Sequence, residues 1–559
     1  MLLMLILAFL CWGKLLFLKG IWWDDWAWVW HYFGSANLSE FMEPFKSLRH
    51  EMDGYLFFLN MKLMDIIPEA ATNIWNIWKF MIFFANSVIL YAIAKNALKR
   101  ESILPEAIAV IYLVSPIVNN LWTVELGRRI YLGIFFLSIL LSVKSVSGKK
   151  FKISYYISSV LLAIVSMACL ESFVFFDLAR PFIIFYALYK KAGENISVSV
   201  KKTVIYWLPF VVVGAFVLLL KSNLLIPRSG SYGDTYSLFA FPAGKYLHTV
   251  IYNYARSLYY VLFGNAWHFI KELPTIQRHV IMLLSSLAAA LLAMTVILKG
   301  ISIDDNSQKS GDALNEAKWV TLFGMLLIMA GLFPYAMVRG YPCFGPASRH
   351  ALLASVGVSV LIPSFLLSLH YKGLIKKTAT YLLLGAVIFL GVFQCNRAIA
   401  AYSNDWQQQC SFWRQFTQMV PDIKDKTHLL VDMPREEKSY FGMWGEGIYE
   451  FGCPLNLLYA KTRDRSQLHK HFAMVLADAF NKNNSTFFYP KNKDREEVSF
   501  DSCMGIYKYY PKNLIIVSYR NGRLYLNKDR DRIIHENDGS TYPFRGILGC
   551  MAENRKSKE

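Results

Sequence analysis

Residues 203–220 read TVIYWLPFVVVGAFVLLL, an apolar run without a single charged side chain. A helix of about 20 residues crosses the hydrocarbon core of a bilayer, which is about 30 Å thick. Inside hydrocarbon the backbone must satisfy its own hydrogen bonds, so a run of this kind is expected to be helical. The stretch therefore predicts a membrane-spanning helix.

Similar runs recur along the 559-residue chain, which is 55% hydrophobic and 18% charged. A soluble protein carries about 25% charged residues. The alternation of apolar and polar residues expected of a membrane β-barrel is absent. We therefore predict an α-helical polytopic membrane protein with about eleven spans, at residues 2–20, 79–95, 104–119, 130–143, 154–170, 174–189, 203–220, 279–298, 319–337, 351–369 and 378–394.

Lysine and arginine residues predict how these spans are oriented. If the N-terminus is cytoplasmic, the inner loops hold 17 Lys and Arg in 59 residues, and the outer loops hold 14 in 150. Basic residues concentrate on the cytoplasmic side of membrane proteins, so this orientation is favoured. The net charge of +19 then follows mostly from topology, and a nucleic-acid partner is not needed to explain it.

The composition divides the chain into two parts. Residues 1–394 form the predicted transmembrane domain, with long outer loops at 21–78, which contains amphipathic stretches, and at 221–278. Residues 395–559 are polar and predict a small extracytoplasmic α/β or α+β domain. Within it we expect a helix over 404–420, a strand over 427–434 and a hairpin that turns at Asn521-Gly522.

The most informative segment is IWWDDWAWVWHYFG at residues 21–34. Asp24 and Asp25 are adjacent carboxylates among five tryptophans. One interpretation is an aromatic belt at the membrane interface. The other is chemical, because apolar surroundings make a carboxylate a better proton acceptor and paired carboxylates can hold a divalent cation. The residues alone leave both open.

Further charged residues are predicted at the outer ends of later spans, where ionisable groups are functional candidates. Asp177 and Arg180 fall in a predicted outer loop at 171–181, and we expect Arg180 to pair there with another charged residue or with lipid headgroups. Glu125 and Arg349 each lie in a Gly- or Pro-punctuated turn, which favours function. An arginine in such a place can bind a phosphate through two hydrogen bonds.

Six of the eight cysteines lie on the predicted outer side, where an oxidising compartment permits disulfides. Their pairing cannot be deduced from the sequence. Free, buried cysteines and bridges are both open, and no CxxC or His-rich metal pattern occurs.

The arrangement of one span followed by an acidic pair at the start of a long outer loop resembles the C-type (GT-C) membrane glycosyltransferases. These include protein O-mannosyltransferases and the aminoarabinose transferases of bacterial envelopes. WDDW at Trp23 to Trp26 is similar to the acidic motif in the first loop of that group. ELGRRIY, with Glu125, Arg129 and Tyr131, resembles its second outer-loop site, and SRH at Ser348 to His350 resembles its late-loop arginine.

The resemblance implies transfer of a sugar from a polyprenyl-phosphate donor to an envelope acceptor, which is a lipid, glycan or protein. Asp24 or Asp25 would be the general base, and inversion is expected. Arg349, and second Arg129, would bind the donor phosphate. A divalent cation at the Asp pair stays open. The location implied is the bacterial inner membrane, and the implied substrate-binding residues are Glu125, Tyr131, Trp23, Trp26 and His350.

Three alternatives remain at this point. A transporter or flippase of lipid-linked sugars would place ionisable or helix-breaking residues near mid-membrane, and the sequence offers few. A polymerase of envelope polysaccharides would carry arginine-rich outer loops. A non-catalytic scaffold would tolerate loss of the Asp pair.

Overall fold

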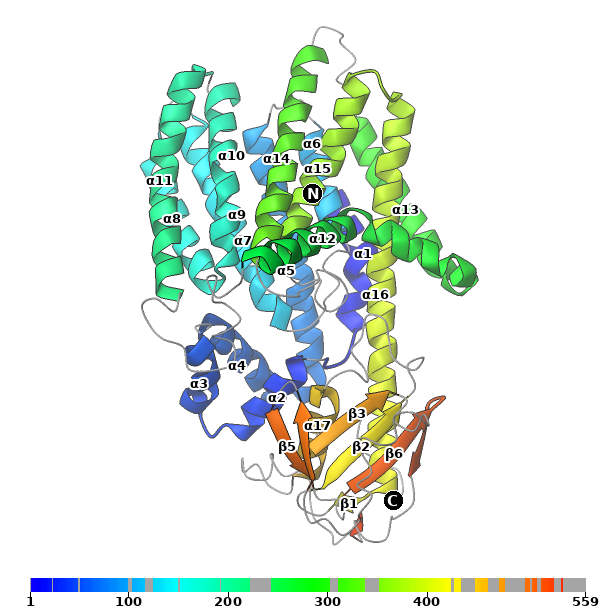
Figure 1. Ribbon diagram of the computed structural model, residues 1–559. Helices are drawn as coiled ribbons and strands as arrows, with labels where there is room; N and C mark the ends of the chain where they lie inside the picture. Colours follow the sequence, from blue (N-terminus) through cyan, green and yellow to red (C-terminus); the bar gives the residue numbers. More distant parts are fainter. Residues whose placement is uncertain are drawn as a thin grey trace.

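The structure is a computed structural model, and it describes residues 2–22, 24–48, 51–98, 103–115, 124–148, 151–191, 193–221, 243–301, 310–336, 351–423, 427–433, 448–460, 472–477, 498–502, 505–509, 514–526 and 534–535. Helices form a bundle, and the strands lie beyond one end of it (Figure 1). We call that end, which also carries α2, α3 and α4, the sheet end, and the opposite end the far end.

The described helices are α1 (Leu2–Trp12), α2 (Asp24–Gly34), α3 (Leu38–Leu48), α4 (Glu51–Ile66), α5 (Pro68–Ala97), α6 (Leu104–Leu113), α7 (Val124–Val146), α8 (Ile153–Cys169), α9 (Ser172–Phe176), α10 (Arg180–Tyr186), α11 (Ile196–Lys221), α12 (Ala243–Glu272), α13 (Val280–Ile301), α14 (Ser310–Ala336), α15 (Leu352–Tyr371), α16 (Lys377–Met419) and α17 (Ile448–Tyr459). Short 3₁₀ turns occur at Gly13–Phe17, Asp177–Ala179 and Leu273–His279, and a π-helical turn at Ala187–Lys191.

Among the described residues, seven helices are long and apolar enough to cross a membrane: Ala70–Ala97, Leu126–Val146, Ser172–Tyr189, Ile196–Leu220, Gly311–Pro334, Leu352–Tyr371 and Lys377–Met419. This confirms the prediction of an α-helical protein with several apolar helices of membrane-spanning length. Four shorter apolar helices, Leu2–Phe17, Leu104–Leu113, Ile153–Cys169 and Val280–Thr295, overlap the other predicted spans. The count of eleven spans stays a prediction.

The predicted outer loop at 171–181 overlaps the predicted span at 174–189, and the structure agrees with the span. These residues are almost entirely helical and belong to the apolar segment Ser172–Tyr189, in which α9, a 3₁₀ turn, α10 and a π-helical turn follow one another. Asp177 and Arg180 therefore lie inside the bundle, at the break between α9 and α10. The expected pairing of Arg180 does occur, because its Nε donates to Asp177 Oδ1 at 2.6 Å.

Arg180 is fully buried, and its other N–H groups donate to serines of neighbouring helices. Nη2 donates to Ser138 Oγ at 3.0 Å, and Nη1 donates to Ser142 Oγ at 2.7 Å and to Ser159 Oγ at 3.3 Å. The Trp207 indole donates to Asp177 Oδ2 at 3.3 Å. The pair thus binds α10 to α7, α8 and α11.

Helices α14 and α15 pack with their backbones in close approach. A Cβ at Gly357 would lie only 2.5 Å from the backbone nitrogen of Ile328. Small residues permit such contact between helices within a membrane bundle. Helix α12, which occupies the predicted loop 221–278, instead runs across the bundle at a large angle to α14 and α16 (Figure 1).

Helix α16 connects the bundle to the strands without a break. Its 43 residues span about 65 Å at 1.5 Å per residue, roughly twice the thickness of a hydrocarbon core. The predicted helix at 404–420 is its last part, and the predicted domain boundary at 394–395 falls within it. Cys410 near this end is disulfide-bonded, whereas Cys11, Cys169, Cys395 and Cys453 form no disulfide.

The described strands are β1 (Asp422–Ile423), β2 (His428–Met433), β3 (Phe472–Ala477), β4 (Val498–Ser502), β5 (Gly505–Tyr509), β6 (Leu514–Arg520), β7 (Arg523–Leu526) and β8 (Ile534–His535). Four of them form a sheet in the order β3-β2-β6-β7, in which β2 is parallel to β3 and β6, and β6 is antiparallel to β7. β1 pairs with β8 and β4 with β5.

Two sequence predictions in this region are confirmed. β2 occupies the predicted strand, and the β6–β7 hairpin turns at Asn521 and Gly522, with φ of 51° and 74°. Two consecutive residues with positive φ are the requirement of a type I′ turn, which Asn-Gly meets.

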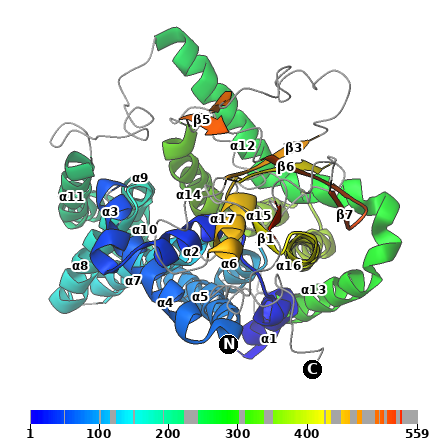
Figure 2. The same cartoon turned by 90° about the horizontal axis from the view of Figure 1, so that it is seen from below.

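An apolar core joins the sheet to the first-loop helices. Trp26 of α2, Trp413 of α16, Phe451 of α17 and Val517 of β6 are all completely buried in it. Helix α17 lies beside α2 and also contacts β3 (Figure 2). The N-terminal loop helices and the C-terminal strands are therefore one packed unit at the sheet end.

The Asp177–Arg180 pair provides a test of the bundle. Removing one partner of a buried ion pair leaves an uncompensated charge, which costs about 3–5 kcal/mol. We expect Asp177→Leu and Arg180→Met each to lower the thermal unfolding midpoint of the purified protein strongly. In the double variant the midpoint should fall by much less than the sum of the two single decreases. Additive decreases would contradict the pairing of Asp177 with Arg180.

A second prediction concerns His428 at the start of β2. Burial lowers the pKa of His428 from 6.5 to about 4. Between these values the unfolded chain binds a proton that the folded chain does not, so the free energy of unfolding falls as the pH drops. Since one pKa unit corresponds to about 1.4 kcal/mol, the loss should be on the order of 3 kcal/mol. Between these pH values, the free energy of unfolding of His428→Gln should depend less steeply on pH than that of the wild type. An equally steep dependence in the two proteins would contradict the prediction.

Candidate functional site

Three charged side chains meet where α2, α5 and α7 adjoin at the sheet end. They are Asp25 at the start of α2, Lys79 of α5 and Arg129 of α7, with exposed fractions of 2%, 3% and 6%. Asp25 and Arg129 both lie close enough to Lys79 to act on its ammonium group electrostatically. We call these three residues the charged cluster.

Lys79 is held by the helix that carries it. Its Nζ donates to Asn76 Oδ1 at 3.3 Å, and the Asn76 amide donates to the carbonyl oxygen of Leu18. The segment that leads from α1 into α2 is thereby tied to α5. Asn76 and Lys79 are three residues apart and so lie on one face of the helix.

Arg129 is fixed against the same helix. Its guanidinium carbon lies 3.8 Å from the centroid of the Phe83 ring, a cation–π contact. Asn86 Nδ2 donates to the carbonyl oxygen of Arg129 at 2.9 Å. Phe83 and Asn86 lie on the same face of α5 as Asn76 and Lys79. One stripe of α5 therefore carries Lys79 of the charged cluster and contacts Arg129.

The charged cluster holds two cations and one carboxylate, a formal charge of +1 in a buried place. Placing charges in apolar surroundings is costly unless opposite charge compensates them. A further anion at this position would balance the cluster, and lysine and arginine are the side chains that bind phosphate. The cluster can therefore combine phosphate binding with a carboxylate that accepts a proton.

The tryptophans around Asp25 determine where α2 begins. Trp26 is fully buried, donates from Nε1 to Gln409 Oε1 at 3.1 Å and stacks on Trp406 with ring centroids 6.4 Å apart. Trp22 contacts Tyr402 and Trp406 edge-on. These rings face α16 and not a bilayer, so they anchor the acidic pair to the sheet end.

The structure describes only some of the other site residues that the sequence predicted. Asp24 and Glu125 lie in α2 and α7, but their side chains fall outside the described residues, as do Trp23, Arg349 and His350 entirely. Arg128, for which the sequence favoured a structural role, is half-buried next to Arg129. The structure thus brings together Asp25 and Arg129 from the predicted set.

Tyr131 takes part in a separate contact. Its hydroxyl donates to Asp53 Oδ1 at 2.7 Å, which joins α7 to α4 of the first long loop. Gly127, one turn earlier on α7, lies against the same carboxylate, because a Cβ there would be 2.9 Å from Asp53 Oδ1. This contact holds the loop helices against the bundle near the charged cluster.

Sequence reasoning missed Lys79 and Asp53 as site residues. Lys79 looked like a charge at the edge of a span, and Asp53 like one acid on an amphipathic helix. A usable signal was the polar stripe Asn76, Lys79 and Asn86, which recurs on one face of an otherwise apolar helix. Asp53 offered no comparable signal, because its partner lies 78 residues away.

Metal binding was left open for the Asp pair. Among the described side chains, no three His, Cys, Asp or Glu residues converge to hold an ion. Lys79 and Arg129 beside Asp25 would also repel a divalent cation. The described side chains of the charged cluster therefore do not fit a divalent cation.

Comparison of the chain with models of protein families, with curated proteins and with solved structures found no match in any of the three.

The close approach of Gly127 to Asp53 gives a third prediction. Gly127→Ala inserts a methyl group where the Asp53 carboxylate lies, and overpacking of this kind costs about 1–3 kcal/mol. We expect α4 to be displaced, with faster proteolytic cleavage within residues 38–66 and a lower unfolding midpoint. Gly311→Ala is the matched control, because nothing lies within 4 Å of its Cβ position. Equal cleavage rates and equal unfolding midpoints in Gly127→Ala and Gly311→Ala would refute the close approach of Gly127 to Asp53.

Proposed function

We propose that the protein is a membrane glycosyltransferase of GT-C type, which moves a sugar from a polyprenyl-phosphate donor to an acceptor hydroxyl in the cell envelope. The observation that carries the proposal is the charged cluster. Asp25 alone would fit many roles, but a buried carboxylate beside two cations, at the end of two apolar helices, supplies the groups that this transfer needs. The finer fold, eleven spans with a docked extracytoplasmic domain, belongs to the same proposal.

The donor phosphate would bind Lys79 and Arg129. A polyprenyl-phospho-sugar is a phosphodiester with one negative charge, which balances the +1 charge of the cluster. When the bond between the anomeric carbon and the phosphate oxygen breaks, the departing polyprenyl phosphate gains a second negative charge. Cations fixed in advance at this position stabilise that developing charge, and Arg349 would add to them.

Asp25 would act as the general base. The acceptor hydroxyl attacks the anomeric carbon, its proton passes to the Asp25 carboxylate, and the electron pair of the broken bond leaves with the phosphate. A single displacement inverts the anomeric centre. Before the donor binds, the positive charges of Lys79 and Arg129 lower the proton affinity of the Asp25 carboxylate. Once the phosphate neutralises these charges, the carboxylate becomes a better proton acceptor.

Two observations support an extracytoplasmic site. Lys and Arg concentrate in the loops predicted at the far end, which favours an outer position for the sheet end. Cys410 at the sheet end is disulfide-bonded, and disulfides persist in oxidising compartments. We propose the bacterial inner membrane, with the lipid chain of the donor in the bilayer and its sugar at the sheet end.

The proposal gives the other residues lesser roles. Trp26 positions α2 and does not stack on the sugar, because its ring is buried between protein groups. Tyr131 holds Asp53 and α4 at the rim of the site. Trp23, Glu125 and His350 remain proposed substrate contacts.

One observation favours the rival function of a transporter for lipid-linked saccharides. The α9–α10 break carries the Asp177–Arg180 pair inside the bundle, and broken helices with charges mark transport sites. However, the guanidinium is completely buried and bonded to one carboxylate and three serines. A guanidinium with its donors so engaged is built to hold helices together, and so the charged cluster is the better candidate site.

The fourth prediction tests the cluster in cells. Asp25→Asn should abolish transfer while the protein still accumulates, because the amide cannot accept the acceptor's proton. Loss of a general base lowers rates by about 10²–10⁴-fold. Lys79→Gln should instead weaken donor binding. The measurement is the glycan composition of envelopes from cells that carry each variant, with protein levels checked by immunoblot.

Asp65→Asn serves as the control, since it makes the same change in the same long loop, where Asp65 faces Lys62 at 4.0 Å. Its envelopes should match the wild type. Normal glycans in Asp24→Asn, Asp25→Asn and Lys79→Gln at normal protein levels would reject the catalytic proposal and leave a transporter or a scaffold.

A further inference from the structure

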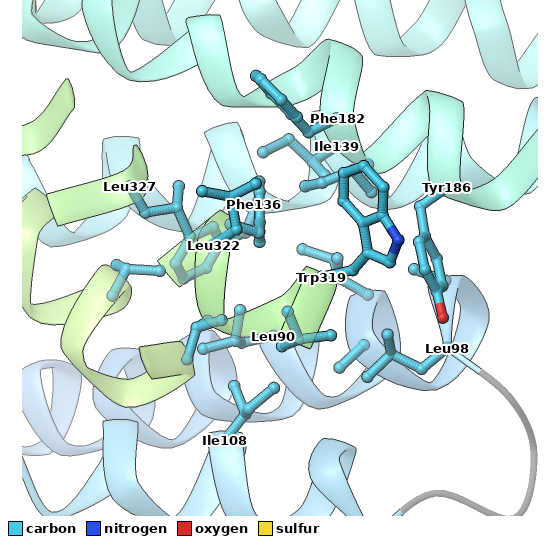
Figure 3. A pocket seen from close by; sticks show the side chains of 18 of the residues that line it. Leu90, Leu98, Ile108, Phe136, Ile139, Phe182, Tyr186, Trp319, Leu322 and Leu327 are labelled. Atoms are coloured by element: carbon cyan, nitrogen blue, oxygen red, sulfur yellow. The ribbon is translucent and has the colours of Figure 1, made fainter. Parts of the chain in front are cut away.

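An apolar cavity lies between the helices, and Figure 3 shows the side chains that line it. Its lining residues on α5, Leu90 to Leu98, lie beyond Lys79 towards the far end. Apolar side chains of α5, α6, α7, α14 and α15 and of the segment that contains α10 line the cavity. Along α5 it extends from Leu90 to Leu98, eight residues or about 12 Å. That length is close to half of a hydrocarbon core, the depth of one leaflet.

The cavity is open on one side. Its floor is buried, with Phe176 at 1% and Val356 at 2% exposed. Its mouth is formed by Phe182, Trp319 and Leu322, which are 39%, 45% and 46% exposed (Figure 3). Because the helices on both sides of the mouth are among those of membrane-spanning length, the opening faces hydrocarbon and not water.

The mouth carries the features of a membrane interface. Trp319 prefers the level of the lipid headgroups. Lys318 precedes it on α14, Lys95 follows the lining residue Ala94 on α5, and both lysines are exposed. The acid of α14 near the mouth, Glu316, is buried and accepts a hydrogen bond from the Tyr186 hydroxyl at 2.9 Å.

On α6, Glu106 accepts a hydrogen bond from the Tyr91 hydroxyl, to which Lys95 Nζ in turn donates at 2.8 Å. Glu316 is thus buried and Glu106 is engaged by Tyr91. The exposed charged groups described beside the mouth are Lys95, Lys318 and Asp312, the last within electrostatic reach of Tyr186, so the lysines outnumber the acid. Exposed lysines at the headgroup level attract anionic lipid.

We infer that this cavity binds one acyl chain of an anionic phospholipid from the leaflet at the far end, with its headgroup beside Lys95 and Lys318. The far end is the side that the Lys and Arg distribution predicts to be cytoplasmic, where anionic lipid attracts basic residues. The apolar lining stabilises the chain without hydrogen bonds, and the two lysines select the headgroup charge. The site is separate from the charged cluster, since Lys79 lies 11 residues, or about 16 Å, before Leu90 on α5.

The fifth prediction uses a pair of matched substitutions. Ala94→Phe fills the cavity from its wall, whereas Ala288→Phe adds the same ring to an exposed position of α13. The purified full-length protein is delipidated and then incubated with equal amounts of phosphatidylglycerol, phosphatidylethanolamine and a polyprenyl phosphate. Native mass spectrometry then identifies the bound lipid and gives its stoichiometry.

We expect the wild type and Ala288→Phe to retain one phosphatidylglycerol, and Ala94→Phe to retain at least about fivefold less. The double variant Lys95→Gln/Lys318→Gln should bind the two phospholipids equally. Equal phosphatidylglycerol on the wild type and Ala94→Phe would overturn the inference. Retention of the polyprenyl phosphate in place of phospholipid would also overturn it, and would assign the cavity to a donor chain.

A second measurement applies if Ala94→Phe does not fold. Phosphatidylglycerol brominated on its acyl chain should quench the fluorescence of Trp319, seen as the difference between the wild type and Trp319→Phe. Quenching should be stronger than with the brominated phosphatidylethanolamine. Equal quenching by the two lipids, or none by either, would refute the site. Neither measurement depends on glycosyl transfer, so their outcome is independent of the proposed function.

Discussion

A charge inside a bundle of apolar helices loses its hydration, and other groups of the protein must compensate for that loss. Arg180 and the charged cluster, both buried in the described part of the chain, are compensated differently. At Arg180, one carboxylate and three serine hydroxyls occupy the guanidinium donors, so the group is complete and fastens four helices. At the charged cluster, Asp25 and Arg129 both act electrostatically on Lys79. The proposed chemistry is assigned there because a donor phosphate would bring an anion to the two cations.

The position of Asp25 depends on residues far from it in the chain. Trp26 bonds to Gln409 and packs on Trp406, both on the part of α16 that extends beyond bilayer length. The apolar core that includes Trp26 also takes in the sheet and α17. The C-terminal strands therefore support the start of α2, and through it the carboxylate. A soluble part that is held this closely acts as a structural support of the site.

The sequence predicted local features well and left one buried feature undecided. Interactions between near neighbours produce the long apolar helices, the Asn521-Gly522 turn and the β2 strand. The local sequence pattern is therefore enough to predict them. The sequence left the segment around Asp177 and Arg180 divided between an outer loop at 171–181 and a span at 174–189. It is helical and buried, with serines of α7 and α8 accepting hydrogen bonds from Arg180 and Trp207 of α11 donating to Asp177. For the site, Asp25 and Arg129 were found from their motifs, whereas Lys79 was seen only as an edge charge.

By itself, the sequence determined the class of protein and the local elements, because apolar run length and turn chemistry depend on residues close together in the chain. It also singled out the acidic pair at residues 24–25. Only the tertiary structure decided which charges meet, since Asp25, Lys79 and Arg129 are each at least 50 residues apart in sequence. Their meeting depends on the packing of α2, α5 and α7. The structure also decided that the tryptophans beside Asp25 are anchors, because their burial against α16 is a property of the folded chain.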